Sequence, residues 1–294
     1  MPNFDFLEGA ADLHVHSSPD VDPRRFDDIE LAQEAARAGM AALLIKSHQN
    51  STVERASLVS KIVPKIQVFG GLVLNDTVGG LNPAAVRLAL RMGAKEIWMP
   101  TRSARNHRRA CGEGDGGIEI LDADGRLVPV IDSILDLMAG SDCILGSGHL
   151  SPWETIALIG RAREHGVRRI LVTHPEWTAT SFPIELQRDL AAGGGVSFER
   201  CFVSTTQRCG FTPMKTIADA IAEVGIETTI LSTDLGQPDT PPPAAGMQLY
   251  AEQLRAFGFS VDQLRRMMVA NPLGLLDAPL VQPDGRGSDD AYPG

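Results

Sequence analysis

Short apolar segments alternate with amphipathic helical patterns along almost the whole chain, and this alternation most constrains its fold. Strands that alternate with helices form a parallel sheet, because each helix crosses back over the sheet before the next strand begins. Eight such units, about 25–30 residues apart, predict a closed α/β barrel of the (β/α)8 TIM type. A doubly wound open sheet is the alternative. The apolar segments are residues 11–16, 41–46, 66–74, 96–99, 142–147, 169–173, 195–204 and 228–233.

Helix punctuation supports the same architecture. Asn82 and Ser151 each precede a proline, a pairing typical of a helix start. Glu154, three residues after Ser151, fits a capping box better than a site residue. The seventh strand is the least defined, because GVSFE and RCFVS each suit it. We expect a single barrel domain over residues 1–280 and a tail without periodicity over residues 281–294.

Composition narrows the class of protein. The chain has 294 residues and a formal net charge of −10, which offers no basic surface for nucleic acid or an anionic membrane. Its four cysteines are scattered, so reduced thiols are expected. No apolar run approaches the roughly 18 residues of a membrane span, and the N-terminus lacks a signal-peptide pattern. These features predict a soluble cytoplasmic protein, with a homo-oligomer among the states left open.

The segment ADLHVHSSPD places two histidines on one face of the first strand, because side chains alternate along a strand. Alone, this pattern is better explained by two ordinary polar residues at a strand end than by a shared metal ion. However, five of the seven histidines follow predicted strands, at the carboxyl end where barrels hold their active sites. Imidazole and carboxylate suit Zn²⁺, with Mn²⁺ or Fe²⁺ as alternatives. We therefore expect one or two divalent ions, held by His14, His16, His149, His174 and Asp234.

The order of these residues resembles the amidohydrolase superfamily of metal-dependent hydrolases. The resemblance rests on H-x-H on strand one, histidines after strands five and six, and an aspartate after strand eight. ANPLGLL (270–276) is similar to a helix that follows the last strand in that group. The segments DLHVH, GGLNP, WMPT, GHLS, THPE and STDLGQ resemble a bacterial branch for which no substrate is implied. The resemblance implies that Asp234 takes a proton from the attacking water and passes it to the leaving group.

One departure from that superfamily concerns lysine. Strand four reads EIWMPT and lacks the lysine that many members carry there; Glu96 lies at its start, away from the site. Lys46, at the end of strand two, is the only well-placed lysine. It is either a carbamylated metal bridge, an ammonium that acts on the substrate, or a salt-bridged residue beside a mononuclear site. We favour the ammonium.

A basic segment after strand four gives the hint about the substrate. Arginine side chains fit carboxylate or phosphate, so a small anionic molecule is expected. A solvated loop with surface salt bridges is the alternative explanation. Trp153 and Trp177 either wall the pocket or pack the barrel top. In the first βα loop, Asp20, Asp22 and Arg24 either gate the site or cap the next helix. The residues expected to bind substrate are Lys46, His48, Arg102, Arg105 and His107, with Arg108 and Arg109 in the same segment.

These patterns favour an enzyme. The first hypothesis is a metal-dependent hydrolase that cleaves an amide, cyclic amide, lactone or ester of a small anionic substrate. Its catalytic residues would be Asp234, Lys46 and His174. A mononuclear metal-dependent decarboxylase, a phosphoesterase and an inert binding barrel are the alternatives. Strand seven would add either Glu199 or Thr205 to the site.

Overall fold

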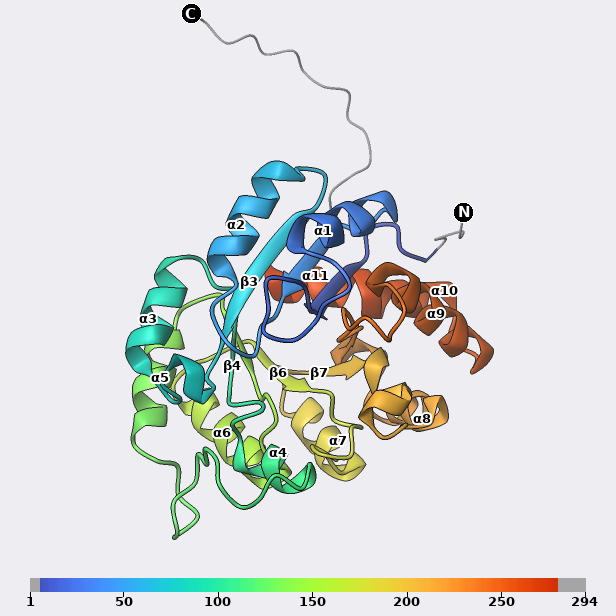
Figure 1. The fold of residues 1–294 in the computed structure, drawn as a ribbon. Coiled ribbons are helices and arrows are strands. Elements are labelled where there is room, and N and C mark those ends of the chain that lie inside the picture. The colour runs from blue at the N-terminus through green and yellow to red at the C-terminus, as the bar shows by residue number, and fades with distance from the viewer. Residues whose placement is uncertain (1–5, 280–294) are drawn as a thin grey trace, which may run out of the picture.

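A computed structural model describes residues 6–279, and its strands form one parallel sheet in the order β1 to β8 (Figure 1). The strands are β1 (Ala11–Val15), β2 (Ala42–Ile45), β3 (Gln67–Val73), β4 (Glu96–Trp98), β5 (Ile144–Gly146), β6 (Ile170–Thr173), β7 (Val196–Cys201) and β8 (Thr229–Ser232). The α-helices are α1 (Asp28–Arg37), α2 (Val53–Ile62), α3 (Pro83–Arg91), α4 (Arg105–Ala110), α5 (Val130–Met138), α6 (Pro152–Glu164), α7 (Ile184–Ala192), α8 (Met214–Val224), α9 (Pro243–Ala256), α10 (Val261–Arg265) and α11 (Asn271–Leu276).

The barrel closes where β8 ends beside β1. The backbone nitrogen of His16 donates to the carbonyl of Leu235 at 2.8 Å, and that of Asp234 donates to the carbonyl of His14 at 2.7 Å. The Asp12 carboxylate also accepts the Thr233 backbone N–H at 3.0 Å. Sequence-order pairing with this closure confirms the (β/α)8 barrel and excludes the doubly wound sheet, whose strand order reverses.

The predicted helix starts are confirmed at the level of single side chains. The Asn82 side chain accepts from the backbone nitrogens of the first turn of α3, and Ser151 forms a capping box with Glu154 at α6. A further capping box, formed by Asp27 and Glu30, starts α1. These caps satisfy backbone N–H groups that have no partner within the helix, so Glu154 belongs to the helix end rather than to the site.

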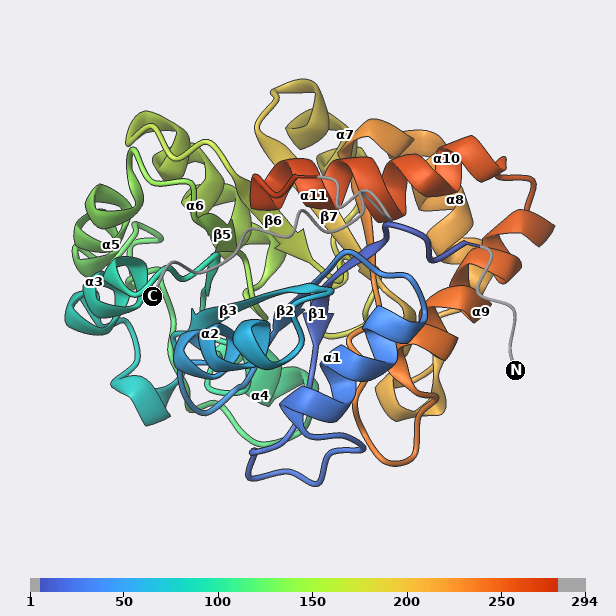
Figure 2. The same cartoon turned by 90° about the horizontal axis from the view of Figure 1, so that it is seen from above.

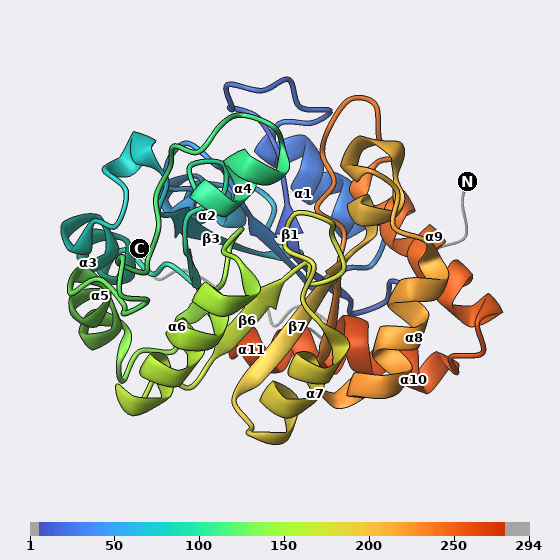
Figure 3. The same cartoon turned by 90° about the horizontal axis from the view of Figure 1, so that it is seen from below.

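The C-terminal helices cover the end of the barrel opposite the predicted site. The Asn271 side chain, at the start of α11, donates to the carbonyls of Ile226 and Thr229 at 2.7 Å each, just before and at the start of β8. Figures 2 and 3 accordingly show α11 and α4 on opposite sides of the barrel. The predicted tail, residues 281–294, lies outside the described residues. None of the helices in the described part of the chain has the length and apolar character to cross a membrane.

Candidate metal centre

Three side chains converge where β1 and β8 meet. The Nε2 atom of His16 lies 3.0 Å from Oδ1 of Asp234, and the Nε2 atom of His14 lies 3.2 Å from the same oxygen. Both histidines are buried, whereas Asp234 keeps some access to solvent. Strand alternation brings the two imidazoles to one face, as predicted, and the turn after β8 supplies the carboxylate. The three donor atoms are close enough to share one ion.

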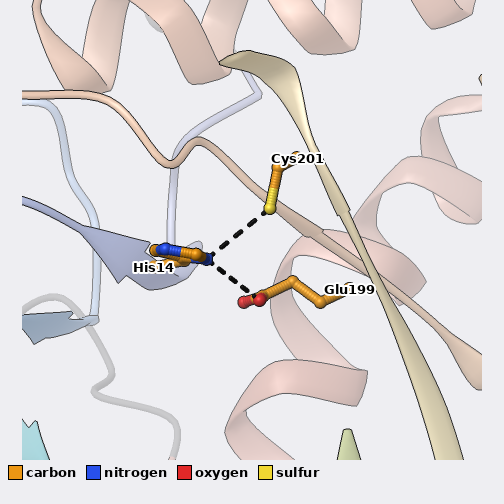
Figure 4. Close-up of side chains that lie close together, drawn as sticks. All are labelled: His14, Glu199 and Cys201. Atoms are coloured by element: carbon orange, nitrogen blue, oxygen red, sulfur yellow. Dashed lines mark hydrogen bonds and ion pairs between the residues drawn. The ribbon is translucent and has the colours of Figure 1, made fainter. Parts of the chain in front are cut away.

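Glu199 contacts His14 on the side of the ring opposite the shared site. The Nδ1–H of His14 donates to Oε2 of Glu199 at 3.0 Å, while Ser232 Oγ donates to the other carboxylate oxygen at 2.9 Å (Figure 4). We assign the imidazole proton to Nδ1 on the basis of this pairing, which leaves the Nε2 lone pair on the side of the shared site. A carboxylate that orients a histidine through its second nitrogen is typical of metal-ligating histidines.

Cys201 lies on the same side of β7, with Sγ 3.7 Å from His14 Nδ1 (Figure 4). His14, Glu199 and Cys201 therefore form a second group of close donor atoms. However, burial and the neighbouring Glu199 carboxylate raise the pKa of the Cys201 thiol well above its ordinary value. A protonated thiol is a poor ligand, so we interpret this second group as the support of His14.

The imidazoles of the site are neutral, as metal ligands must be. Burial lowers the pKa of His14 to about 3, although Asp234 opposes the shift. Burial also lowers the pKa of His16 well below its ordinary value, and the Arg24 guanidinium adds to that effect. The donor set of two imidazole nitrogens and one carboxylate oxygen thus fits a divalent ion such as zinc.

Lys46 reaches the same atoms from β2. Its Nζ lies 3.0 Å from Nε2 of His14 and 5.1 Å from the centre of the Trp98 ring, and the residue is fully buried. Burial lowers the pKa of Lys46, whereas the carboxylates of Asp234, Glu199 and Glu96 raise it. The expectation that Lys46 faces the pocket from strand two therefore agrees with its position, and the neighbouring acidic groups favour its charged form while burial opposes it.

The other predicted histidines line the adjoining wall. The ring centres of His149 and His174 are 4.9 Å apart, and His174 is 6.1 Å from His14. The Nδ1 atoms of His149 and His107 are 2.8 Å apart. Within the described residues, the close three-donor groups contain neither His149 nor His174, so their role as metal ligands stays a prediction.

The neighbouring wall is aromatic and polar. The indole of Trp177 meets the ring of His174 edge-on, at 4.9 Å between ring centres. His48 stacks on His16 at 5.1 Å and pairs through Nδ1 with Thr101 Oγ1 at 2.9 Å. Trp177 thus lies where a pocket wall was expected. Trp153 does not, because its side chain is largely exposed to solvent on α6.

Two of the five non-glycine residues with a positive φ in the described part of the chain are site residues. His174 has a φ of 31° and Asp234 a φ of 53°, both in the left-handed region that non-glycine residues rarely adopt. The Thr180 hydroxyl donates to the His174 carbonyl at 2.7 Å. Next to this turn, the fully buried Arg200 forms an ion pair with Glu176. Strained residues persist only where surrounding contacts hold them, and they are concentrated at functional sites.

The arginines after β4 divide into two groups. Arg105, Arg108 and Arg109 form ion pairs with nearby carboxylates on the surface of the loop, as the salt-bridge alternative predicts. Arg102 instead pairs with Asp22 of the first βα loop, at 2.6 Å. Arg102 therefore remains the better candidate for substrate binding, and the role of Arg105 stays a prediction.

Two buried acidic residues matter more than their sequence positions suggested. Glu96 is the first residue of β4, at the end of the strand away from the site as expected, yet it is fully buried and lies close enough to Lys46 to raise the pKa of that lysine. Glu199, not Thr205, faces the site, because β7 covers most of GVSFE and ends at Cys201, whereas Thr205 belongs to the short 3-10 helix (Phe202–Thr205) that follows. Alternation along VSFERC would have placed Glu199 and Cys201 on one face once the strand was assigned.

A sequence comparison places the chain in a family. The family described as "Family of unknown function (DUF6282)" matches residues 9–199, well over half of the chain. The chain belongs to this family. The matched range includes the H-x-H pair, Lys46, His149, His174 and Glu199, whereas Asp234 lies beyond it. Among curated proteins, none matches this sequence.

Solved structures with the same fold are amidohydrolase-superfamily proteins. An amidohydrolase from Pseudomonas aeruginosa has a TM-score of 0.61 at 11% identity, over 93% of this chain and 96% of that one. An organophosphorus hydrolase from Deinococcus radiodurans has a TM-score of 0.58 at 16% identity, over 91% and 92%. A 2,6-dihydroxybenzoate decarboxylase from Rhizobium has a TM-score of 0.52 at 13% identity, over 92% and 99%. The resemblance to that superfamily is thus confirmed at the level of the fold.

Proposed function

We propose that this protein is a metal-dependent hydrolase that cleaves a C–N or C–O bond in a small anionic substrate. The observation that carries the proposal is the convergence of His14 Nε2, His16 Nε2 and Asp234 Oδ1, with Glu199 fixing the tautomer of His14. The barrel resembles solved hydrolases whose names include an amidohydrolase and an organophosphorus hydrolase. An amide, cyclic amide, lactone or ester would suit such a site.

His14, His16 and Asp234 would hold the ion, most suitably zinc, and His149 and His174 would hold a second one if two bind. A divalent ion bound there supplies a Lewis acid and lowers the pKa of water toward neutrality. The Asp234 carboxylate, partly open to solvent, accepts the proton of the attacking water and returns it to the leaving group.

Other side chains act on the substrate. The Lys46 ammonium, whose charged form the nearby Asp234 and Glu199 favour, polarises the carbonyl under attack. His174, neutral because burial lowers its pKa to about 3, donates a hydrogen bond to the developing oxyanion. His48 and His107 line the approach to these groups, within ring-contact distance of His16 and His149 respectively.

Hydrolysis can be tested with a panel of lactones, cyclic amides and aryl esters, each carrying a carboxylate. Chelator-treated protein should lose turnover and regain it with Zn²⁺, Mn²⁺ or Fe²⁺. Asp234→Asn should stay inactive after metal is added, because the amide cannot accept the proton. Full turnover in chelator-treated protein would contradict the proposal.

A metal-dependent decarboxylase is the second candidate, because β4 ends in Trp98 and offers no lysine that could bridge two ions. Trp98 is buried, with its ring 6.5 Å from that of His14. An indole cannot bridge two ions, which favours a mononuclear site. Release of CO₂ from aromatic carboxylates, without hydrolysis of the panel above, would support this alternative. The phosphoesterase hypothesis gains no specific support from the described residues.

A further inference from the structure

The mouth of the barrel holds a carboxylate between two guanidinium groups. Oδ2 of Asp22 lies 2.6 Å from Nη1 of Arg102 and 3.7 Å from Nη2 of Arg24. This oxygen has no contact with solvent, yet among the described residues it makes no hydrogen bond of good geometry. The carboxylate of a free molecule is not tied to the backbone as that of Asp22 is. It could therefore accept well-aligned hydrogen bonds from both guanidinium groups.

The two arginines differ in how firmly they are held. The Arg24 side chain is 2% exposed, and its Nε and Nη2 donate to Oδ2 of Asp20 at 3.1 and 2.9 Å. The Arg102 and Asp22 side chains are 40% and 33% exposed, so both can move. The group contains the guanidinium groups of Arg24 and Arg102 and the carboxylates of Asp20 and Asp22, so its net charge is zero. If Asp22 swings out, one net positive charge remains, which matches a single carboxylate.

This group adjoins the metal centre. Arg24 and Arg102 both lie close enough to His16 to lower its pKa. The Arg24 loop is tied to the β8–α9 loop, because Nη2 of Arg25 donates to the carbonyls of Pro238 and Thr240 at 2.5 and 2.6 Å. Figure 3 shows this β1–α1 loop between α4 and the β8–α9 loop, on the side of the barrel opposite α11.

We propose that Arg24 and Arg102 form the site that recognises a carboxylate of the substrate, and that Asp22 occupies this site until the substrate displaces it. The substrate class is therefore a carboxylic acid whose scissile bond lies a short distance from its carboxylate. This inference rests on the proposed function for the location of the chemistry, but the anion site itself can be measured without turnover. Asp22 thereby acts as an internal competitor that weakens the binding of carboxylates to this site.

The test is calorimetric titration of the intact protein with succinate at low ionic strength, with inorganic phosphate titrated in parallel. Asp22→Asn keeps the shape of the side chain and removes its charge, so it should tighten succinate binding about three- to tenfold by removing the competitor. Arg102→Gln should weaken binding at least tenfold, and the double variant should lose the gain. Asp219→Asn, which removes an exposed partner of Lys215 on α8, controls for net charge and should leave binding unchanged.

Unchanged or weaker succinate binding in Asp22→Asn would overturn the inference, since it would make Asp22 a support of Arg102. Phosphate bound more tightly than succinate would overturn the carboxylate class. The metal content of the same samples separates the two proposals. Protein that contains no metal but still binds succinate more tightly in Asp22→Asn would contradict the hydrolase proposal and support the anion site. Protein that contains metal but shows no tighter succinate binding in Asp22→Asn would contradict the anion site and leave the hydrolase proposal standing.

Discussion

Gly236 offers the sharpest perturbation of the metal centre without touching a ligand. It follows Asp234 by two residues and has a φ of 130°, where an L-amino acid is strained. A Cβ atom at this position would lie 2.7 Å from the carbonyl carbon of His16 and closer still to its oxygen. Ordinary contacts of this kind are about 3.5–4.0 Å. Gly236→Ala must therefore push the turn after β8 away from β1 by at least about 0.8 Å, and by more where the Cβ meets the carbonyl oxygen.

The magnitude follows from two costs. A non-glycine residue in a disfavoured backbone region costs about 1–3 kcal/mol, and an overpacked contact adds about 1–3 kcal/mol. Gly236→Ala should thus lower the free energy of unfolding by about 2–6 kcal/mol. A shift of the turn also separates Asp234 from the two histidines, whereas metal–ligand distances tolerate about 0.2 Å. We expect metal affinity to fall at least tenfold.

Gly258→Ala is the matched control. Gly258 has a φ of 97°, but a Cβ there would meet nothing within 4 Å, so only the backbone cost of about 1–3 kcal/mol applies. Urea unfolding of the metal-free variants and competition with a chromophoric chelator measure the two quantities. If Gly236→Ala matched Gly258→Ala in metal affinity, the turn after β8 would not position a metal ligand.

Three further predictions address other parts of the site. Lys46→Met should keep its metal while kcat falls about 10²-fold or more, the scale of one electrostatic stabiliser; metal loss that small carboxylic acids restore would instead indicate a carbamate. Arg200→Met should cost about 3–5 kcal/mol in urea unfolding by leaving Glu176 buried and unpaired. The exposed control Arg208→Met should cost less than about 1 kcal/mol, and equal costs would contradict the buried pair. Finally, metal-free protein should lose stability as pH falls from 6.5 to 5. The unfolded chain then takes up protons on six histidines whose pKa is lowered in the fold (His14, His16, His48, His107, His149, His174), while the raised pKa values of four buried carboxyls (Asp12, Glu34, Glu96, Glu199) act in the opposite direction. Each proton of net uptake by the unfolded chain corresponds to about 1.4 kcal/mol per pH unit, and urea midpoints that stay flat or rise would refute the prediction.

The barrel was predictable because its signals are local. Alternation in ADLHVH and the caps at Asn82 and Ser151 depend on a few neighbouring residues, and the structure repeats them almost residue for residue. The placement of site residues at strand ends then follows from the fold, since parallel strands present their carboxyl ends together. His14, His16 and Asp234 could therefore be grouped although 220 residues separate the first from the last.

The supporting contacts could not be predicted, because they depend on which faces meet across the barrel. Glu199 supports His14 because β7 and β1 flank β8 and both direct these side chains into the barrel interior. The position of Glu96 at the start of β4 indicated that it lies away from the site. In the folded barrel it nevertheless lies close enough to Lys46 to affect the pKa of that lysine. The pairing of Arg102 with Asp22 joins two loops whose conformations carry no periodic sequence signal.

The central claim is that His14, His16 and Asp234 bind a divalent metal ion. The most direct test is elemental analysis of protein purified without chelator, alongside His16→Ala, Asp234→Ala and the exposed-residue control Asp219→Asn. The wild type and the control should contain at least one divalent ion per chain, with zinc the expected element. The two site variants should contain little or none while remaining folded by circular dichroism. A metal-free wild type, or site variants that keep the full wild-type content, would contradict the account.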